Sequence, residues 1–405
     1  MKYFLFWAAV VFACLSPGCS IRDDFAPVAA CTPVPGDSSA SHPQAAVFQG
    51  ILTEFTREKG LPGIAALVYT PEHGVWMGAA GFSQVENNLP MAPCHLFMSA
   101  SVAKMYHAVL ALEMQEQGML SIDDKIDKYL PGELIEKLPN GRTATIRHLL
   151  NHSSGIPNPT TRLSFLTSYI NDFKRPIATE TYLSYVFGKA PLAGVGEEFN
   201  YSDGNYLLLA MIINRIYGDH ARAMSELVIE PLGLSNTFYR NEAGYKNRAE
   251  LVNSYADLYD ELVLRNVSEE ERIFNESNIG HDGFKFTVHD GYLFLRKLFI
   301  EKALLTSESL DLMLNNDANL VSFTENERAL LGAFLLADDP QVVSISHEGQ
   351  TIGSSAYFGY YPKQQGILIV CSNFGGAVSN RLYEAMFLRS GPERCLLQRL
   401  EEAAF

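Results

Sequence analysis

Apolar positions near both ends of the folded part of this chain change from a helical period to a strand period. AAVFQGILTEFTREKG, which begins at Ala45, places four apolar side chains on one helical face, and Gly60 ends the helix. The four side chains are Val47, Ile51, Leu52 and Phe55. GIAALVYT and GVWMGAAGFS follow as apolar runs separated by PEH, a pattern that predicts an antiparallel hairpin.

The other end of the chain repeats these elements in the opposite order. SSAYFGYYP and GILIVCSNF predict two strands around the turn KQQ, and RLYEAMFL, from Arg381 to Leu388, predicts a helix. The region from about residue 101 to 338 has a mostly helical pattern. We therefore predict an α/β (α+β) fold over residues 45–390, with an antiparallel β-sheet flanked by N- and C-terminal helices, a large all-helical insertion and a C-terminal tail at residues 391–405. A ligand site is expected where the sheet meets the insertion.

The segment before the folded part has the pattern of an export signal. MKYFLFWAAVVFACLSPGC has one positive charge at Lys2, then an apolar run that is short for a membrane span, so residues 1–19 predict a signal peptide. Its end resembles a bacterial lipoprotein cleavage site, which predicts lipidation of Cys19 and anchoring in the bacterial cell envelope. The alternative is an ordinary signal peptide with a soluble exported product. Residues 20–44, rich in Pro, Ser, Ala and Asp, predict a flexible tether.

Charge and cysteine content narrow the classes of function. The net charge is −15 without a basic cluster, which argues against nucleic-acid binding. Four cysteines follow Cys19 without a C-x-x-C spacing, so a zinc site is not expected. They are Cys31, Cys94, Cys371 and Cys395. An exported chain permits disulfides, the four cysteines allow three full pairings, and free buried thiols remain an equally good interpretation.

The first candidate catalytic motif is MSASVAK, in which Ser101 precedes Lys104 by nearly one helical turn. The N-terminus of a helix presents free N–H groups and a positive dipole end, which favour a developing oxyanion. A lysine buried beside the serine would have a lowered pKa and act as a base. The alternative is a serine cap followed by a surface lysine.

Two later stretches supply further polar groups. Tyr201, Ser202 and Asp203 stand just before a strongly apolar helix, where the Tyr201 hydroxyl could relay a proton. His347-x-Gly349 lies on or beside an apolar strand, and glycine in a strand often marks a close backbone approach. The N–H that follows, on Gln350, could form half of an oxyanion hole.

Ser-x-x-Lys, Tyr-Ser-Asp and His-x-Gly occur here in the order, and among the elements, found in the serine β-lactamase-like family. The chain resembles this family, which includes class C β-lactamases, D-alanyl-D-alanine carboxypeptidases and esterase-type penicillin-binding protein relatives. GLPGIAALVYT, HLFMSASVAK, GMLSIDDKIDKYLP and IRHLLNHSSGIP strengthen the likeness, which covers about Ala45 to Leu388.

The resemblance implies acyl-enzyme chemistry without a metal or cofactor, on a small-molecule or peptide substrate. Ser101 would attack a carbonyl, and Lys104 and Tyr201 would share the base and acid work. The backbone N–H groups of Ser101 and Gln350 would form the oxyanion hole. His347 would position Tyr201 or a substrate carboxylate, and Asp203 and Gly349 would also belong to the substrate site.

Two departures from the family pattern bear on the substrate. Asp203 stands where Asn is more usual. An ionised Asp accepts hydrogen bonds but cannot donate one to a substrate. It also favours the charged form of Lys104, which shifts the role of general base toward Tyr201. His-Glu-Gly replaces Lys-Thr-Gly, so a threonine hydroxyl is missing and Glu348 is expected to repel a substrate carboxylate. Both changes argue against an efficient β-lactamase.

We therefore predict an exported serine hydrolase acting on D-amino-acid peptides or small esters and amides. The alternatives are a non-catalytic envelope binding module of the same fold and a weak β-lactamase. His148 and His152 have metal-ligand spacing, but no HExxH pattern accompanies them, so a structural role is expected for both.

Overall fold

The computed structural model describes residues 31, 41–240, 250–277, 279–314, 322–324, 327–339, 342–376, 381–389 and 393–405. These residues form a nine-stranded antiparallel sheet, two three-stranded sheets and helices that surround them. In spatial order the large sheet contains β3 (Leu89–Pro90), β2 (Gly74–Gln84), β1 (Gly63–Thr70), β14 (Gly366–Ser372), β13 (Ser355–Tyr361), β12 (Val342–Gln350), β11 (Phe334–Asp339), β10 (Glu327–Ala329) and β9 (Ser322–Thr324). The two predicted hairpins are present, and β1 from the first pairs with β14 from the second.

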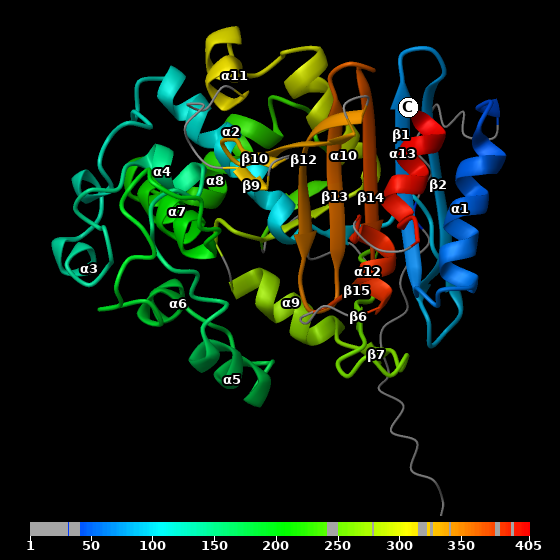
Figure 1. Ribbon diagram of the computed structural model, residues 1–405, viewed down its shortest axis with the longest axis horizontal. Helices are drawn as coiled ribbons and strands as arrows, with labels where there is room; N and C mark the ends of the chain where they lie inside the picture. Colours follow the sequence, from blue (N-terminus) through cyan, green and yellow to red (C-terminus); the bar gives the residue numbers. More distant parts are fainter. Residues whose placement is uncertain are drawn as a thin grey trace, which may run out of the picture.

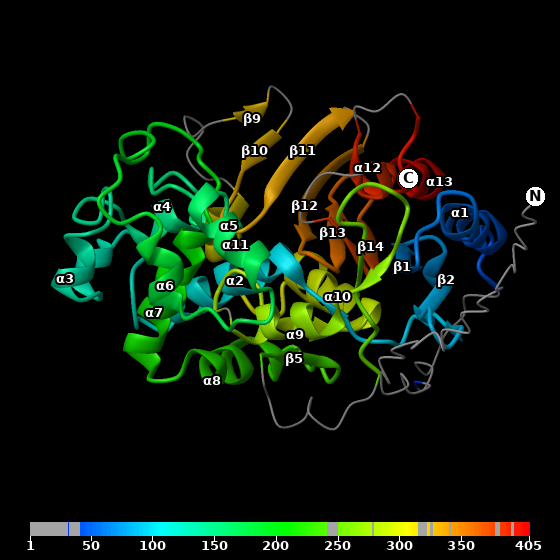
Figure 2. The same ribbon diagram turned by 90° about the horizontal axis from the view of Figure 1, so that it is seen from below.

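The central strands are apolar along their whole length because both faces of the sheet are covered. On one face α1 (Ala45–Arg57), α12 (Arg381–Phe387) and α13 (Leu396–Ala404) pack in a shared core, as Figures 1 and 2 show. On the other face α10 (Val288–Leu295) lies against β1, β13 and β14. This arrangement confirms the predicted sheet flanked by helices from both chain ends.

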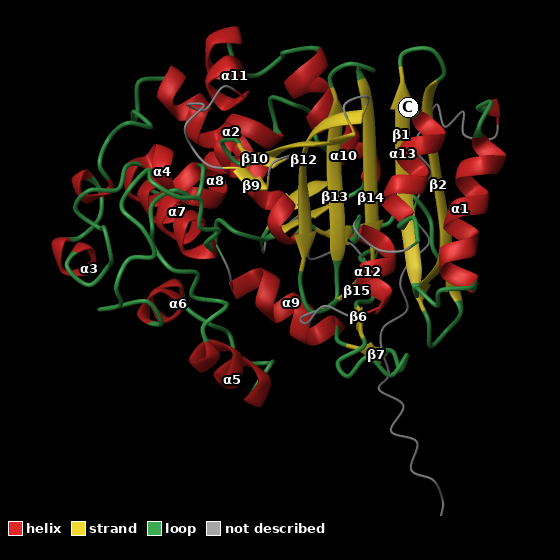
Figure 3. Ribbon diagram, in the orientation of Figure 1, coloured by secondary structure: helices red, strands yellow, loops and turns green. Residues whose placement is uncertain are grey.

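The middle of the chain forms the helical region at one side of the sheet (Figure 3). Its helical elements are η2 (Ala100–Val102), α2 (Ala103–Glu116), η3 (Ile126–Lys128), α3 (Gly132–Ile135), α4 (Ile146–Leu150), α5 (Leu163–Asn171), α6 (Thr179–Ser184), α7 (Asp203–Tyr217), α8 (His220–Met224), η4 (Ser225–Ile229), α9 (Ser268–Ser277), η5 (Arg296–Ile300) and α11 (Ser307–Leu314). The two small sheets are β15 (Phe374–Gly375) with β6 (Tyr255–Ala256) and β7 (Arg265–Asn266), and β4 (Phe97–Met98) with β8 (Phe284–Phe286) and β5 (Thr237–Tyr239). The helical region meets the sheet where η2 contacts β12.

Two predicted boundaries are wrong. The C-terminal tail at 391–405 contains α13, whose apolar side chains Leu396, Leu397 and Leu400 are buried in the core that includes α1. The all-helical insertion does not extend to residue 338, because β9, β10 and β11 join the main sheet. A short apolar run such as AFLLA suits a buried strand as well as a helix, so its periodicity could not decide between them.

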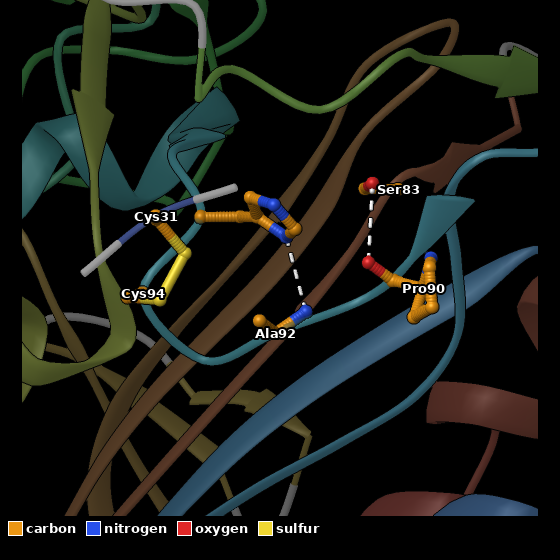
Figure 4. Close-up of a disulfide and its surroundings, with 6 residues drawn as sticks. Cys31, Ser83, Pro90, Ala92 and Cys94 are labelled. Atoms are coloured by element: carbon orange, nitrogen blue, oxygen red, sulfur yellow. Dashed lines mark hydrogen bonds between the residues drawn. A yellow bond between two sulfur atoms is a disulfide. The ribbon is translucent and has the colours of Figure 1, made fainter. Parts of the chain in front are cut away.

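One disulfide joins Cys31 to Cys94, with their Cα atoms 5.7 Å apart (Figure 4). Cys371 and Cys395 are free and buried, so the structure combines the two interpretations that the sequence left open. The bond fixes a residue of the predicted tether to the loop that follows β3. Cys19 and the predicted signal peptide lie outside the described residues. Among the helices that the structure describes, none has the length and apolar character needed to cross a bilayer.

Candidate active site

Ser101 is half-buried and lies in η2, the short helical turn that leads into α2. Ala100, directly before it, adopts a positive φ of 48°, a conformation that a side chain with a Cβ rarely takes. Such backbone strain clusters at functional sites, where the surrounding structure holds it in place. The strained turn lies next to the serine that the sequence singled out.

Lys104 is fully buried on the first turn of α2, so it is not the surface lysine of the alternative interpretation. Its Nζ lies 3.0 Å from Ser101 Oγ and 2.9 Å from Asp203 Oδ1, and it donates more weakly to the His281 carbonyl at 3.4 Å. Burial lowers the pKa of Lys104, but Asp203 and Tyr201 outweigh burial and raise it above the ordinary value. The ammonium therefore stays charged beside Ser101.

Asp203 is the first residue of α7, where a carboxylate interacts favourably with the positive end of the helix dipole. Its Oδ1 pairs with Lys104, and its Oδ2 accepts a hydrogen bond of 2.7 Å from the Thr160 hydroxyl. Burial raises the pKa of Asp203, whereas the Lys104 ammonium and the Thr160 hydroxyl hold it below its usual range. Asp203 is thus an ionised partner of Lys104, as the sequence predicted from the departure at this position.

Tyr201 lies above Lys104, whose Nζ is 4.9 Å from the centre of the tyrosine ring. Burial raises the pKa of Tyr201, and the nearby Lys104 and Ser101 side chains only partly offset this effect. The phenol is therefore neutral at neutral pH, with its hydroxyl beside the other two groups.

His152 packs against Tyr201, with the two ring centres 4.3 Å apart. Burial first, and then Lys104, lower the pKa of His152 far below its ordinary value, so the imidazole is neutral. Its Nδ1 accepts a hydrogen bond from the Ser202 N–H at 3.2 Å. The sequence placed His152 only in a weak metal-spacing pattern, and no group of metal-ligating side chains is present in the described part of the chain.

Strand β12 brings Gly349 against the backbone of the Ser101 turn. A Cβ on Gly349 would lie 2.6 Å from the Ser99 carbonyl oxygen and 2.9 Å from the Ser101 nitrogen. Only glycine permits this approach. Gln350 follows and lines the same pocket as Ser101, so the backbone nitrogens predicted for an oxyanion hole belong to segments in contact.

Replacing Gly349 with alanine is expected to lower kcat/KM by about 100-fold, because the added methyl group pushes β12 away from the Ser101 N–H. Gly50→Ala is the matched control, since a Cβ at Gly50 meets no atom within 4 Å. Hydrolysis kinetics and thermal unfolding of both variants measure the effect. Unchanged kinetics in a folded Gly349→Ala protein would show that this approach does not shape the site.

His347 and Glu348 point to opposite faces of β12, because successive side chains of a strand alternate. The buried His347 ring faces Tyr201 at 6.5 Å between ring centres, and burial followed by Lys104 lowers its pKa to about 3. A neutral imidazole provides no positive charge for a substrate carboxylate. Glu348 interacts with Tyr383 of α12 on the far face, so the prediction that it faces a substrate carboxylate is wrong.

A pocket of about 350 Å³ opens over Ser101 at the junction of sheet and helical region. Its wall combines apolar side chains of α5 with polar groups of α7, β12 and the loop after α9. Lining residues include Phe165, Tyr169, Asp203, His281, Asp282 and Gln350. Among the described residues that line it there is no lysine or arginine, so a substrate carboxylate finds no cationic side chain on this wall.

The profile of the Beta-lactamase family matches residues 48–391, most of the chain. The chain belongs to this family. The family assignment and the mixed sheet-and-helix architecture confirm the resemblance that the motif order indicated, and this family fold supports a serine hydrolase of the β-lactamase-like type.

The relatives of this chain include a penicillin-binding protein. Penicillin-binding protein 4* of Bacillus subtilis is 28% identical over 184 residues, covering 44% of this chain and 38% of the relative. The chain spans about two fifths of the length of the curated relatives that it matches first.

Two solved structures show the same fold over most of their length. The D-amino acid amidase of Ochrobactrum anthropi SV3, complexed with D-phenylalanine, has a TM-score of 0.72 and 20% identity, covering 88% of this chain and 98% of the amidase. EstCE1, a hydrolase with promiscuous acyltransferase activity, has a TM-score of 0.70 and 20% identity, covering 89% of this chain and 98% of EstCE1.

Proposed function

We propose that this protein hydrolyses D-amino-acid amides or peptides, or small esters, through an acyl-enzyme on Ser101. The observation that carries the proposal is the position of Ser101 Oγ, 3.0 Å from the buried Lys104 Nζ at the base of the pocket, with β12 in contact with its backbone. A serine held this way has a charged donor, a phenol and backbone N–H groups within one small site.

The protonation states favour a relay through Tyr201. Because Lys104 is an ammonium, it donates to Ser101 Oγ and stabilises negative charge there, but it has no lone pair to accept the serine proton. The Ser101 oxygen attacks the carbonyl carbon while its proton passes to the Tyr201 oxygen, and the Tyr201 proton passes to the leaving group. One C–O bond forms, the bond to the leaving group breaks, and Tyr201 ends neutral.

The pocket wall favours substrates without a carboxylate at the leaving-group or acyl side. Asp282 and Asp203, the latter paired with Lys104, line the pocket, and its described lining residues include no lysine or arginine, so a substrate carboxylate finds no exposed cationic partner there. Of the two solved structures that share the fold, one is named a D-amino acid amidase and the other a hydrolase with promiscuous acyltransferase activity. A neutral amide or ester therefore suits the pocket better than a β-lactam carboxylate.

Export and attachment to the cell envelope are part of the proposal. The Cys31–Cys94 disulfide is the kind of bond that persists in oxidising compartments outside the cytosol. It supports the export signal read at residues 1–19, and Cys19 would carry the lipid.

A substrate panel tests this choice. We expect turnover of D-phenylalanine amide and of a short-chain p-nitrophenyl ester to exceed that of nitrocefin by about 100-fold or more, because the pocket lacks a partner for the nitrocefin carboxylate. L-phenylalanine amide and a D-alanyl-D-alanine peptide complete the panel. Nitrocefin as the best substrate would contradict the proposal, and a folded protein without any turnover would favour the binding module.

A further inference from the structure

Glu271 of α9 is fully buried beneath the turn that follows β12. Its carboxyl group contacts the Thr351 hydroxyl and accepts a hydrogen bond of 3.0 Å from the Gly353 N–H. The Thr351 N–H in turn donates to the Ser354 carbonyl at 2.9 Å, which closes the turn. Gln350, the predicted second half of the oxyanion hole, is the residue directly before this turn.

The hydrogen bonds around the turn fit a neutral Glu271 better than a charged one. The Thr351 oxygen lies within hydrogen-bond distance of both Glu271 and the Ser354 carbonyl oxygen, at 3.3 Å from the latter, yet a hydroxyl has one hydrogen to donate. If Glu271 is protonated, it donates to Thr351 and Thr351 donates to Ser354. If Glu271 is ionised, one of these two contacts loses its hydrogen.

The turn itself is tightly packed against the segments on both sides of it. A Cβ on Gly375 would lie 2.4 Å from the Thr351 carbonyl oxygen and 2.6 Å from the Gly353 nitrogen. A Cβ on Gly353 would lie 2.7 Å from Val267 Cγ2 on the other side. The turn has little room to shift unless its partner on α9 moves.

We propose that neutral Glu271 is a positioning residue, which holds the turn 351–354 and thereby keeps the Gln350 N–H directed into the oxyanion hole. The inference rests on the proposed function, because it assumes that Ser101 forms an acyl-enzyme.

The groups that face Glu271 keep it protonated near neutral pH. Burial, and after it the Asp282 carboxylate in the loop after α9, raise the pKa of Glu271, and the hydrogen bonds with Thr351 and Gly353 only partly offset them, so the pKa is about 8. From α5 the neutral phenol of Tyr169 faces the same carboxyl group. The active, neutral form is therefore present below about pH 8 and is lost as the pH rises through that value.

The test follows the rate at which a fluorescent fluorophosphonate labels Ser101 as a function of pH in wild type, Glu271→Gln and Glu271→Ala. In wild type the rate is expected to fall about tenfold between pH 7 and pH 9, because a group with a pKa of about 8 is then about nine-tenths ionised. Glu271→Gln keeps a donor group and an acceptor group but does not titrate. The fall of its labelling rate at high pH should therefore shift to higher pH, toward the pKa values of Lys104 and Tyr201. Glu271→Ala should label about tenfold more slowly than wild type at pH 7.

Glu269→Gln, an exposed position on the same helix, is the matched control and should follow the wild-type profile. Superimposed profiles of Glu271→Gln and wild type, or an Ala variant as fast as wild type, would overturn the inference while Ser101 labelling stands. Absence of Ser101 labelling in the wild type would refute the proposed function and this inference with it.

Discussion

Replacing Ser101 with alanine is expected to reduce hydrolysis of the best substrate in the panel by about 10⁴-fold or more, because the oxygen that forms the acyl bond is lost. The Lys104–Asp203 pair does not depend on this hydroxyl, so the fold should persist. Steady-state kinetics and the unfolding midpoint of wild type and variant provide the measurement.

Ser184→Ala is the control for this substitution, since Ser184 is exposed at the end of α6 and donates only to the Thr181 carbonyl. It should keep wild-type kinetics. A Ser101→Ala protein with wild-type turnover would require a different nucleophile and would contradict the role of Ser101 in this site.

Replacing Asp203 with asparagine is expected to lower the free energy of unfolding by about 3 kcal/mol at pH 7, because the buried Lys104 loses its ionised partner. The pH dependence should also change sign. In wild type the pKa of Lys104 is raised above 10.5, so its stabilising contribution is present below pH 10.5 and is lost as the pH rises through the folded-state pKa. In the variant the Asp203 carboxylate no longer opposes the effect of burial on Lys104, so the pKa of Lys104 falls below 10.5. The free energy of unfolding then increases with pH up to about 10.5.

Urea unfolding of both proteins between pH 6 and pH 10 measures this difference. Asp123→Asn is the matched control: Asp123 pairs with Arg147 but its side chain is 65% exposed, and exposed pairs contribute about 1 kcal/mol or less. Equal stability of Asp203→Asn and wild type at all pH values would mean that Lys104 is not held as a buried ammonium.

Local pattern was sufficient to predict the elements that carry the site. Ser101 and Lys104 share one turn, and Gly349 lies in an apolar strand, so spacing alone placed each group on its element. The distance between Tyr201 and Lys104 could not be predicted from the sequence, because it depends on packing between α2 and the start of α7. The structure brings these groups together, and their catalytic roles remain predictions until the variants are measured.

Glu271 and His152 were missed because their importance comes from partners distant in sequence. Glu271 lies among several glutamates in SEEERIFNES, and nothing in that run distinguishes it from the residues beside it. Its partner Thr351 is 80 residues away. His152 contacts Tyr201, 49 positions later, through a tilted contact between the two rings that no local spacing encodes. The alternation of β12 could have placed Glu348 on the face opposite His347, and this signal was available in the sequence.

The acyl-enzyme on Ser101 is tested most directly by locating the covalent adduct. Wild-type protein is incubated with a fluorophosphonate, digested, and the modified peptide is identified by mass spectrometry. We predict one adduct, on the peptide that contains Ser101, and none in Ser101→Ala. An adduct on another residue, or turnover of the substrate panel by Ser101→Ala at the wild-type rate, would contradict this prediction.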